Sequence, residues 1–199
     1  MQFKEFFTEE KNITPKERYH NMVILYGMPA SGKSSVLKYG LINLPNIKVL
    51  TSDQWLELTA EKEGLDLKDP DVSNELHQRI SPKFDKYRDQ VLHSKNRVNL
   101  VIENIGSNYH KLLNLIRKAQ AEDFRVILVW VKVEKETSVE ANLKRDRRVK
   151  IDRVEVSYEN TIKHFDALVD DVEEAWIIDN NTHPDFNDFR SSKFIKRIK

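Results

Sequence analysis

The sequence predicts an α/β protein in which a parallel sheet of about five strands lies between two layers of helices. Three observations support this prediction. Short apolar runs alternate with stretches in which apolar residues recur every three or four positions. The run at 124–133 is almost continuous Val, Ile, Leu and Trp, as in a central strand that is covered on both faces. A glycine-bearing turn joins the first apolar run, 22–26, to the first helical stretch.

Five apolar runs supply the expected strands, and polar or turn-forming residues flank each of them. They cover residues 22–26, 47–50, 98–102, 124–133 and 175–178. Because parallel strands end at the same edge of a sheet, we expect the residues that follow them to converge there.

Helical periodicity fills the segments between these strands. The first helix should end at Pro45, and Pro82 should kink or split the long helical stretch before the third strand. Ser107 is the expected N-cap of the next helix, and Thr137 or Ser138 that of the following one. The polar segment 56–72 carries Gly64 and Pro70, which predicts a mobile connection.

The glycine-bearing turn fits the phosphate-loop pattern of Gly, four residues and Gly-Lys-Ser after a strand. Its residues are Gly27, Met28, Pro29, Ala30, Ser31, Gly32, Lys33, Ser34 and Ser35. The two glycines let backbone N–H groups wrap a triphosphate, and the helix that follows presents unpaired N–H groups to it. Lys33 should reach the β and γ oxygens of ATP, and the Ser34 hydroxyl should ligate Mg²⁺. The motif predicts a P-loop NTPase fold of the nucleotide-kinase-like type.

A kinase also needs a carboxylate that orients and deprotonates the acceptor hydroxyl. Asp53 follows the second strand and is the candidate base, although it would also serve as N-cap of a helix starting near Trp55. Glu103 closes the third strand and is a candidate for Mg²⁺ or acceptor binding, or for simple helix capping. Asn104 and Ser107 are weaker acceptor-pocket candidates, and Trp55 either lines that pocket or packs in the core.

Six cations lie within ten residues after the central strand and one short helix. They are Lys144, Arg145, Arg147, Arg148, Lys150 and Arg153. A solvated helix face is one interpretation. The other is a lid that closes over ATP, with Arg145 and Arg148 three residues apart on one side of a helix. Arginine suits bidentate phosphate contacts better than lysine does.

With these residues in place, the chain resembles the zeta-toxin and polynucleotide-kinase branch of the P-loop kinases over most of residues 20–180. The resemblance is carried by the phosphate loop, by Asp53, by Val-Ile-Glu-Asn-Ile-Gly at 101–106, and by Arg145, Arg148 and Arg153 ahead of Val-Glu-Val-Ser-Tyr at 154–158.

The resemblance implies an ATP-dependent phosphotransferase acting on a hydroxyl group. It makes Lys33 and Ser34 the phosphate and Mg²⁺ residues, Asp53 the base, and the three arginines a lid on the phosphates. It also places residues 180–182 near the adenine. The sequence departs from the family at Leu56, where polynucleotide kinases of this type have Arg, and at Glu57 and Leu58, where zeta toxins have an Asp or Arg-rich stretch.

We therefore expect transfer of the γ-phosphoryl group of ATP to a hydroxyl on a polynucleotide, at its 5′ end or a modified base, or on a nucleotide sugar. Two alternatives stay open: a nucleoside or nucleoside-monophosphate kinase, with Arg79 and Arg88 at the acceptor, and a non-catalytic nucleotide binder. The expected organisation is an N-terminal arm at 1–20, a P-loop kinase domain at 21–180 with its lid at about 136–155, and a polar, then basic, C-terminal tail at 181–199.

Composition narrows the classes further. The formal net charge is +1, so no global field attracts the chain to nucleic acid or membrane. The absence of cysteine excludes disulfides, thiolate metal sites and cysteine nucleophiles. The six histidines show no metal-ligand spacing, and no apolar run is long enough to span a bilayer. We expect a soluble, cytoplasmic protein without a membrane partner.

Overall fold

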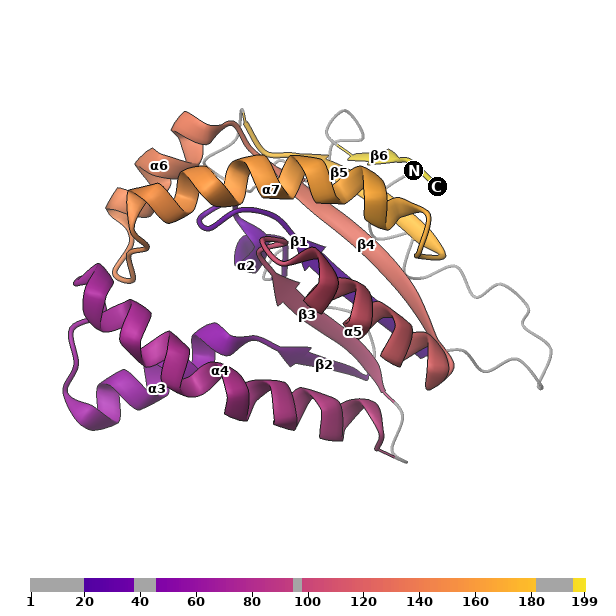
Figure 1. Ribbon diagram of the computed structural model, residues 1–199, viewed down its shortest axis with the longest axis horizontal. Coiled ribbons are helices and arrows are strands. Elements are labelled where there is room, and N and C mark those ends of the chain that lie inside the picture. The colour runs from indigo at the N-terminus through magenta and orange to yellow at the C-terminus, as the bar shows by residue number, and fades with distance from the viewer. Residues whose placement is uncertain (1–19, 38–45, 95–97, 182–194) are drawn as a thin grey trace.

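The computed structural model describes residues 20–37, 46–94, 98–181 and 195–199 (Figure 1). Within these residues the strands form one sheet in the order β2-β3-β1-β4-β5-β6. Their bounds are β1 His20–Tyr26, β2 Ile47–Leu50, β3 Asn99–Asn104, β4 Phe124–Lys132, β5 Glu174–Asp179 and β6 Ile195–Arg197. The first five strands pair in parallel, which confirms the predicted P-loop kinase sheet.

Strand β6 was not predicted, because its three residues lie in the stretch assigned to the C-terminal tail. It pairs antiparallel with β5. The buried Glu174 carboxylate at the start of β5 pairs with Arg125 and, at 3.0 Å, with Arg197. This shared carboxylate holds β6 to the sheet edge.

Helices lie on both faces of the sheet; in the view of Figure 1, α5 and α7 cross in front of it and α2 lies behind. The helices described are α2 Lys33–Val36, α3 Ser52–Glu63, α4 Pro70–Leu92, α5 Tyr109–Ala121, α6 Lys135–Lys144 and α7 Ile151–Val169. No helix in this described part of the chain is both long and apolar enough to cross a bilayer.

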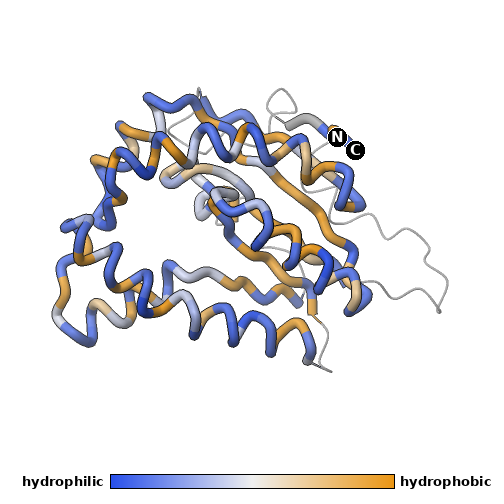
Figure 2. The backbone as a smooth tube through the Cα atoms, in the orientation of Figure 1, coloured by the Kyte–Doolittle hydropathy of each residue, from blue (hydrophilic) through white to orange (hydrophobic). Residues whose placement is uncertain are grey.

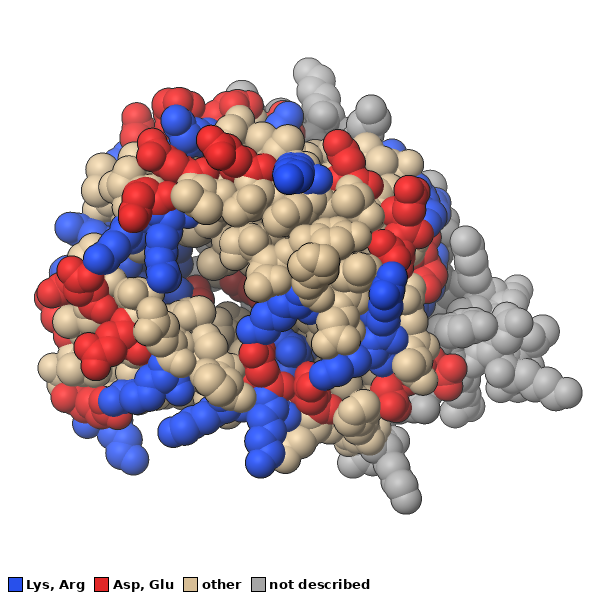
Figure 3. Space-filling model, viewed as in Figure 1, with Lys and Arg blue, Asp and Glu red and all other residues tan. Residues whose placement is uncertain are grey.

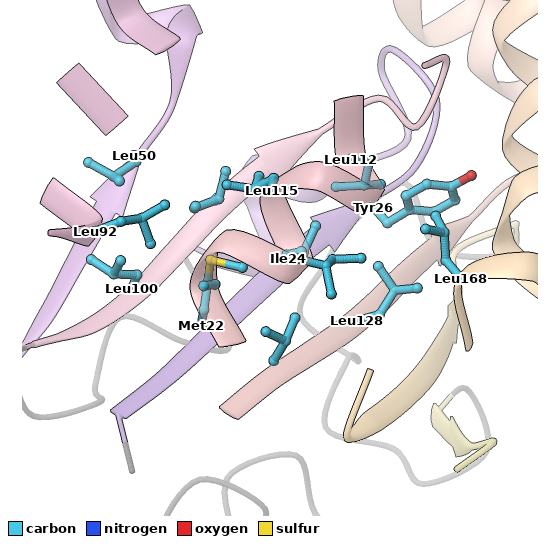
Figure 4. Close-up of a cluster of buried hydrophobic side chains, with 14 of the residues drawn as sticks. Met22, Ile24, Tyr26, Leu50, Leu92, Leu100, Leu112, Leu115, Leu128 and Leu168 are labelled. Carbon is cyan, nitrogen blue, oxygen red and sulfur yellow. The ribbon is translucent and has the colours of Figure 1, made fainter. Parts of the chain in front are cut away.

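Two buried apolar clusters lie on opposite faces of the sheet, because successive side chains of a strand point to opposite sides. On β1, Met22, Ile24 and Tyr26 belong to the larger cluster, whereas Val23 and Leu25 belong to the smaller one beside α2. Figure 4 shows the larger cluster, into which α5 and α7 insert leucines. In Figure 2 the central strands are hydrophobic over most of their length and the helices only along one side. This layering fixes where each strand ends.

The mobile connection predicted at 56–72 is wrong over its first half, because α3 continues to Glu63. Leu56 and Ala60, four residues apart, are both buried against the core. Gly64 ends the helix at a φ of +67°, in the left-handed conformation typical of glycine at a helix C-terminus. Pro82 does not split α4, which runs unbroken from Pro70 to Leu92.

Both predicted N-caps are also wrong. Asn108, not Ser107, caps α5 by accepting from the Lys111 backbone N–H at 2.9 Å. Helix α6 begins at Lys135, before either predicted cap, and the buried Ser138 lies one turn inside it.

Arg145 and Arg148 do not share a helix face, because α6 ends at Lys144 and α7 begins at Ile151. The Asn142 side chain closes the connection between them: its amide donates to the Val149 carbonyl at 2.7 Å and accepts from the Val149 N–H at 3.0 Å. The arginines therefore project from an irregular turn, where a three-residue spacing sets no common direction.

Candidate active site

The predicted convergence at the carboxyl edge of the sheet is realised as a cavity of about 580 Å³. Its walls come from the phosphate loop after β1, the start of α3 after β2, the end of β3, and the α6–α7 connection. Among the residues predicted for the phosphate loop, the base, Mg²⁺ binding and the lid, those that line it are Pro29 to Ser35, Asp53, Glu103 and Arg145.

The phosphate loop is tightly closed against the sheet. Gly27 has a φ of +154°, and a Cβ built there would lie 2.6 Å from the Val131 carbonyl oxygen and 2.8 Å from Ser31 Oγ. No larger residue fits at this position without a shift of backbone. Gly32 precedes α2 at a φ of +92°, so the chain turns directly from the loop into the helix.

Two buried side chains hold this loop from outside, and neither was predicted to contact the loop. Ser138 Oγ of α6 donates to the Pro29 carbonyl at 2.7 Å, and Asn180 Nδ2 donates to the Ser31 carbonyl at 2.8 Å. Asn180 follows β5 directly, and its own Oδ1 is buried without a hydrogen-bond partner in the described structure. Of the segment 180–182 that the resemblance places near adenine, Asn180 and Asn181 line the cavity, and residue 182 lies outside the described residues.

Lys33 is buried within the loop. Its ammonium donates to the carbonyls of Gly27 at 2.8 Å and Met28 at 2.6 Å. Burial lowers the pKa of Lys33 to about 8, although the nearby Glu103 and Asp53 carboxylates favour the charged form. A cation shielded from water in this way interacts strongly with any anion that enters the cavity.

Ser34 and Glu103 place two oxygen atoms side by side: Ser34 Oγ donates to Glu103 Oε2 at 3.3 Å. Burial raises the pKa of Glu103, opposed by the charge of Lys33 and by the Ser34 hydrogen bond. The described residues include no group of three His, Asp or Glu that could hold a metal ion by itself. The pair fits Mg²⁺, a hard ion that takes few protein oxygens and completes its shell with phosphate and water.

Asp53 lies in the first turn of α3, whose N-cap is Thr51; the Thr51 hydroxyl accepts from the Asp53 N–H at 3.2 Å. The alternative role of Asp53 as an N-cap is therefore wrong. Its carboxylate pairs with Arg147 and lies 3.8 Å from Arg145. Arg147 was not singled out from the run of cations, and it makes the closer contact.

A second cavity of about 410 Å³ adjoins the first. Arg148 and Arg153 line this second cavity and not the first, whereas Arg147 lines both. The three arginines predicted as one lid on ATP are thus divided, with Arg145 alone at the phosphate-loop cavity.

Other candidates separate in the same way. Asn104 lines the first cavity and Ser107 the second. Trp55 lines neither; its ring packs edge-on against Phe84, with centroids 5.8 Å apart, and at 5.3 Å from Tyr87. Of its two interpretations, the structure supports packing.

The arginines suggested for a nucleoside kinase lie elsewhere. Arg88 is buried and pairs with Asp85 at 2.9 Å, and Arg79 pairs with Glu63 at 2.5 Å. Neither lines a cavity described above. Leu56, at the position of the polynucleotide-kinase arginine, is buried in the core and lines neither cavity.

Comparison with protein families gives one match: the family model described as Zeta toxin aligns with residues 4–188. A search of the curated proteins gives no match.

Solved structures share the fold at low sequence identity. The PezAT chromosomal toxin-antitoxin system of Streptococcus pneumoniae has a TM-score of 0.58 and 16% identity, over 89% of this chain and 77% of that one. The AvrRxo1-ORF1:-ORF2 structure with ATP has a TM-score of 0.59 and 15% identity, over 90% of this chain and 58% of that one. The Pnkp1/Rnl/Hen1 RNA repair complex has a TM-score of 0.58 and 18% identity, over 77% of this chain and 48% of that one.

Proposed function

The chain belongs to the zeta-toxin family, and from that premise we propose that it is an ATP-dependent phosphotransferase with a hydroxyl acceptor. One observation carries the proposal: the phosphate loop with Lys33, the Ser34–Glu103 pair and the Asp53 carboxylate all line a single cavity. This arrangement brings together a phosphate cradle, a site for Mg²⁺ and a general base. Residues 21–180 form the proposed kinase domain, with a lid at about 136–155 built on α6 and the connection after it.

The phosphate loop binds the donor. Backbone N–H groups of the loop and of the start of α2 would bind the triphosphate, and Lys33 would exchange its loop carbonyls for the β and γ oxygens. Mg²⁺, when bound, screens the charge that develops on the phosphates; Ser34 and Glu103 would hold it. The structural neighbour described with ATP agrees with this choice of donor.

Asp53 acts on the acceptor. The acceptor hydroxyl donates its proton to the Asp53 carboxylate while its oxygen forms a bond to the γ-phosphorus. The bond between that phosphorus and the β,γ-bridging oxygen breaks, and ADP leaves. Arg145, 3.8 Å from Asp53 and on the wall of the same cavity, stabilises the charge of the phosphoryl group in transfer.

The favoured acceptors are a hydroxyl of a polynucleotide or of a nucleotide sugar. The neighbour from an RNA repair complex supports the first, but Leu56 is buried where that branch has its phosphate-binding arginine. A nucleoside or nucleoside-monophosphate kinase is less well supported, because Arg79 and Arg88 are committed to Glu63 and Asp85. A non-catalytic nucleotide binder would need no base beside the loop, whereas Asp53 lines the cavity.

The test is an acceptor screen with γ-labelled ATP and Mg²⁺ against oligonucleotides, nucleotide sugars and free nucleosides. Lys33→Ala should abolish labelling in a folded protein. Asp53→Asn should lower kcat by about 10²- to 10⁴-fold with ATP affinity nearly unchanged. The matched control is Glu57→Gln, an exposed carboxylate on the same helix outside the cavity, and it should stay active. Labelling by Asp53→Asn at the parent rate would remove Asp53 from the base role.

A further inference from the structure

The second cavity lies between the first turns of α4 and α7. Ser73 and Asn74 of α4 line one wall, and Arg153 and Ser157 of α7 line another. Figure 3 shows the molecule hollowed between these helices, with Lys and Arg side chains beside the hollow. The cavity has the size of a small-ligand site, and charged side chains are placed among largely apolar walls.

Its lining is strongly cationic. The ionisable lining residues, besides His77, are Arg147, Arg148, Lys150, Arg153 and Asp152. Lys150 pairs with Asp71, and Arg147 with Asp53. Within the described residues no ion pair is found for the side chains of Arg148 or Arg153. Neither guanidinium group is thus held in an ion pair, and among the described residues the Asp152 carboxylate is the one acidic group in the same lining.

Buried polar atoms at this cavity lack partners. Arg148 Nε, Arg147 Nε and Asn74 Oδ1 are shielded from solvent and make no hydrogen bond in the described structure. A buried donor without an acceptor is unfavourable, and a buried charged one more so. An anion in the cavity would offset the charge of these two guanidinium groups, whose shielded Nε atoms do not themselves open onto it.

The two cavities adjoin and share part of their walls. The residues that line both are Pro29, His77, Ile105, Arg147 and Val149. At this junction Arg147 lines the second cavity and also pairs with the Asp53 carboxylate of the first. Burial and the charge of Arg147 lower the pKa of His77, so the junction carries no further cation at neutral pH. A ligand in the second cavity is therefore placed to present a hydroxyl to Asp53.

We infer that the second cavity binds a phosphate-bearing acceptor, and that Arg148 and Arg153 hold the acceptor's phosphate and not the phosphates of ATP. This inference rests on the proposed function. The sequence groups these three arginines in one lid, whereas the inference gives them different substrates. Arg145 contacts the phosphoryl donor, and Arg148 and Arg153 contact the acceptor.

The probe is inorganic pyrophosphate, titrated calorimetrically into protein that is saturated with a β,γ-imido analogue of ATP and Mg²⁺. Because the analogue fills the phosphate loop, pyrophosphate reports on a second anion site. The test variant is Arg148→Gln/Arg153→Gln. The control is Arg79→Gln/Arg117→Gln, which removes two exposed cations outside both cavities and gives the same net charge. Circular dichroism melting establishes that each variant is folded.

We expect one pyrophosphate to bind the analogue-loaded parent and control proteins. In the test variant its Kd should rise at least about tenfold, while the Kd of the analogue changes by less than about threefold. If the test variant loses affinity for the analogue and keeps its affinity for pyrophosphate, both arginines contact the phosphates of ATP, and the inference is overturned. Absence of pyrophosphate binding to the analogue-loaded parent would overturn it as well.

Failure of the proposed function gives a different result, because the analogue itself would then not bind the parent protein. In that case pyrophosphate is titrated into the parent and the test variant without analogue. Loss of pyrophosphate binding in the test variant then shows that Arg148 and Arg153 form an anion site. Competition then separates two sources of the phosphate: displacement by a nucleoside diphosphate indicates a small acceptor, and displacement only by a short oligonucleotide indicates a polynucleotide.

Discussion

The buried ammonium of Lys33 gives a quantitative prediction for stability against pH. It lies among the Gly27 and Met28 carbonyls, and burial lowers its pKa from 10.5 to about 8. Below pH 8 the folded and unfolded states are both protonated, and the folded state bears the full penalty of the buried charge. Between about 8 and 10.5 the unfolded chain holds one proton more than the folded chain, so the free energy of unfolding rises with pH.

The interval between the two pKa values sets the size of the effect. At about 1.4 kcal/mol for each pH unit, Lys33 should add about 3 kcal/mol to the free energy of unfolding from neutral pH to about pH 10.5. Lys33→Met keeps the length of the side chain and removes the titrating group. The contributions of the other titrating groups cancel when the free energy of unfolding of the variant is subtracted from that of the wild type, because both proteins share these groups.

Urea unfolding of both proteins, at steps from about pH 7 to about pH 10.5, measures this difference. A difference that stays constant to within about 0.5 kcal/mol would refute the reasoning, since Lys33 would then titrate alike in both states. A bound triphosphate should favour the charged ammonium and raise its pKa, so saturating ATP analogue should flatten the rise over about pH 8 to 9. This second result connects the stability measurement to the proposed donor site.

Three further substitutions test the packing around the site. Gly106→Ala should lower the free energy of unfolding by about 2–4 kcal/mol in urea, because the new Cβ would lie 2.1 Å from Tyr26 Cε2 at a φ of +75°; an unchanged midpoint would contradict this. Tyr26→Phe removes the donor that binds the Thr161 carbonyl at 2.7 Å and should lower the free energy of unfolding by about 1–2 kcal/mol; stability equal to the parent's would contradict a role for this hydrogen bond. Asn180→Ala frees the Ser31 carbonyl and should weaken calorimetric binding of an ATP analogue by about three- to tenfold; parent-like affinity would show that the loop needs no support from β5.

Helix α3 shows how a polar segment is misjudged from its sequence. Half of residues 56–63 are charged, and only Leu56 and Ala60 are buried. Two inward positions four residues apart suffice to hold a helix on the core, but they are too few to give a strong periodic signal. The Thr51 cap and the Gly64 terminator were the local signals that could have identified this helix.

The loop supports were beyond sequence analysis for a different reason. Ser138 and Asn180 contact residues 109 and 149 positions away along the chain. The sequence offered Ser138 as a candidate helix N-cap and Asn180, through the family resemblance, as a residue near the adenine, and neither assignment indicates a contact with the loop carbonyls. Only the packing of α6 and the end of β5 against the loop gives them a role.

The sequence by itself determined the parallel sheet, the phosphate loop and the positions of Asp53 and Glu103. These depend on contiguous signals: apolar runs, one nine-residue motif, and the rule that parallel strands end at one edge. The tertiary structure alone decided which arginine faces which cavity. Between α6 and α7 the backbone has no period, so each side chain takes its direction from its own φ and ψ and from the Asn142–Val149 closure. Arg147 thus contacts Asp53, and its neighbour Arg148 lines the other cavity.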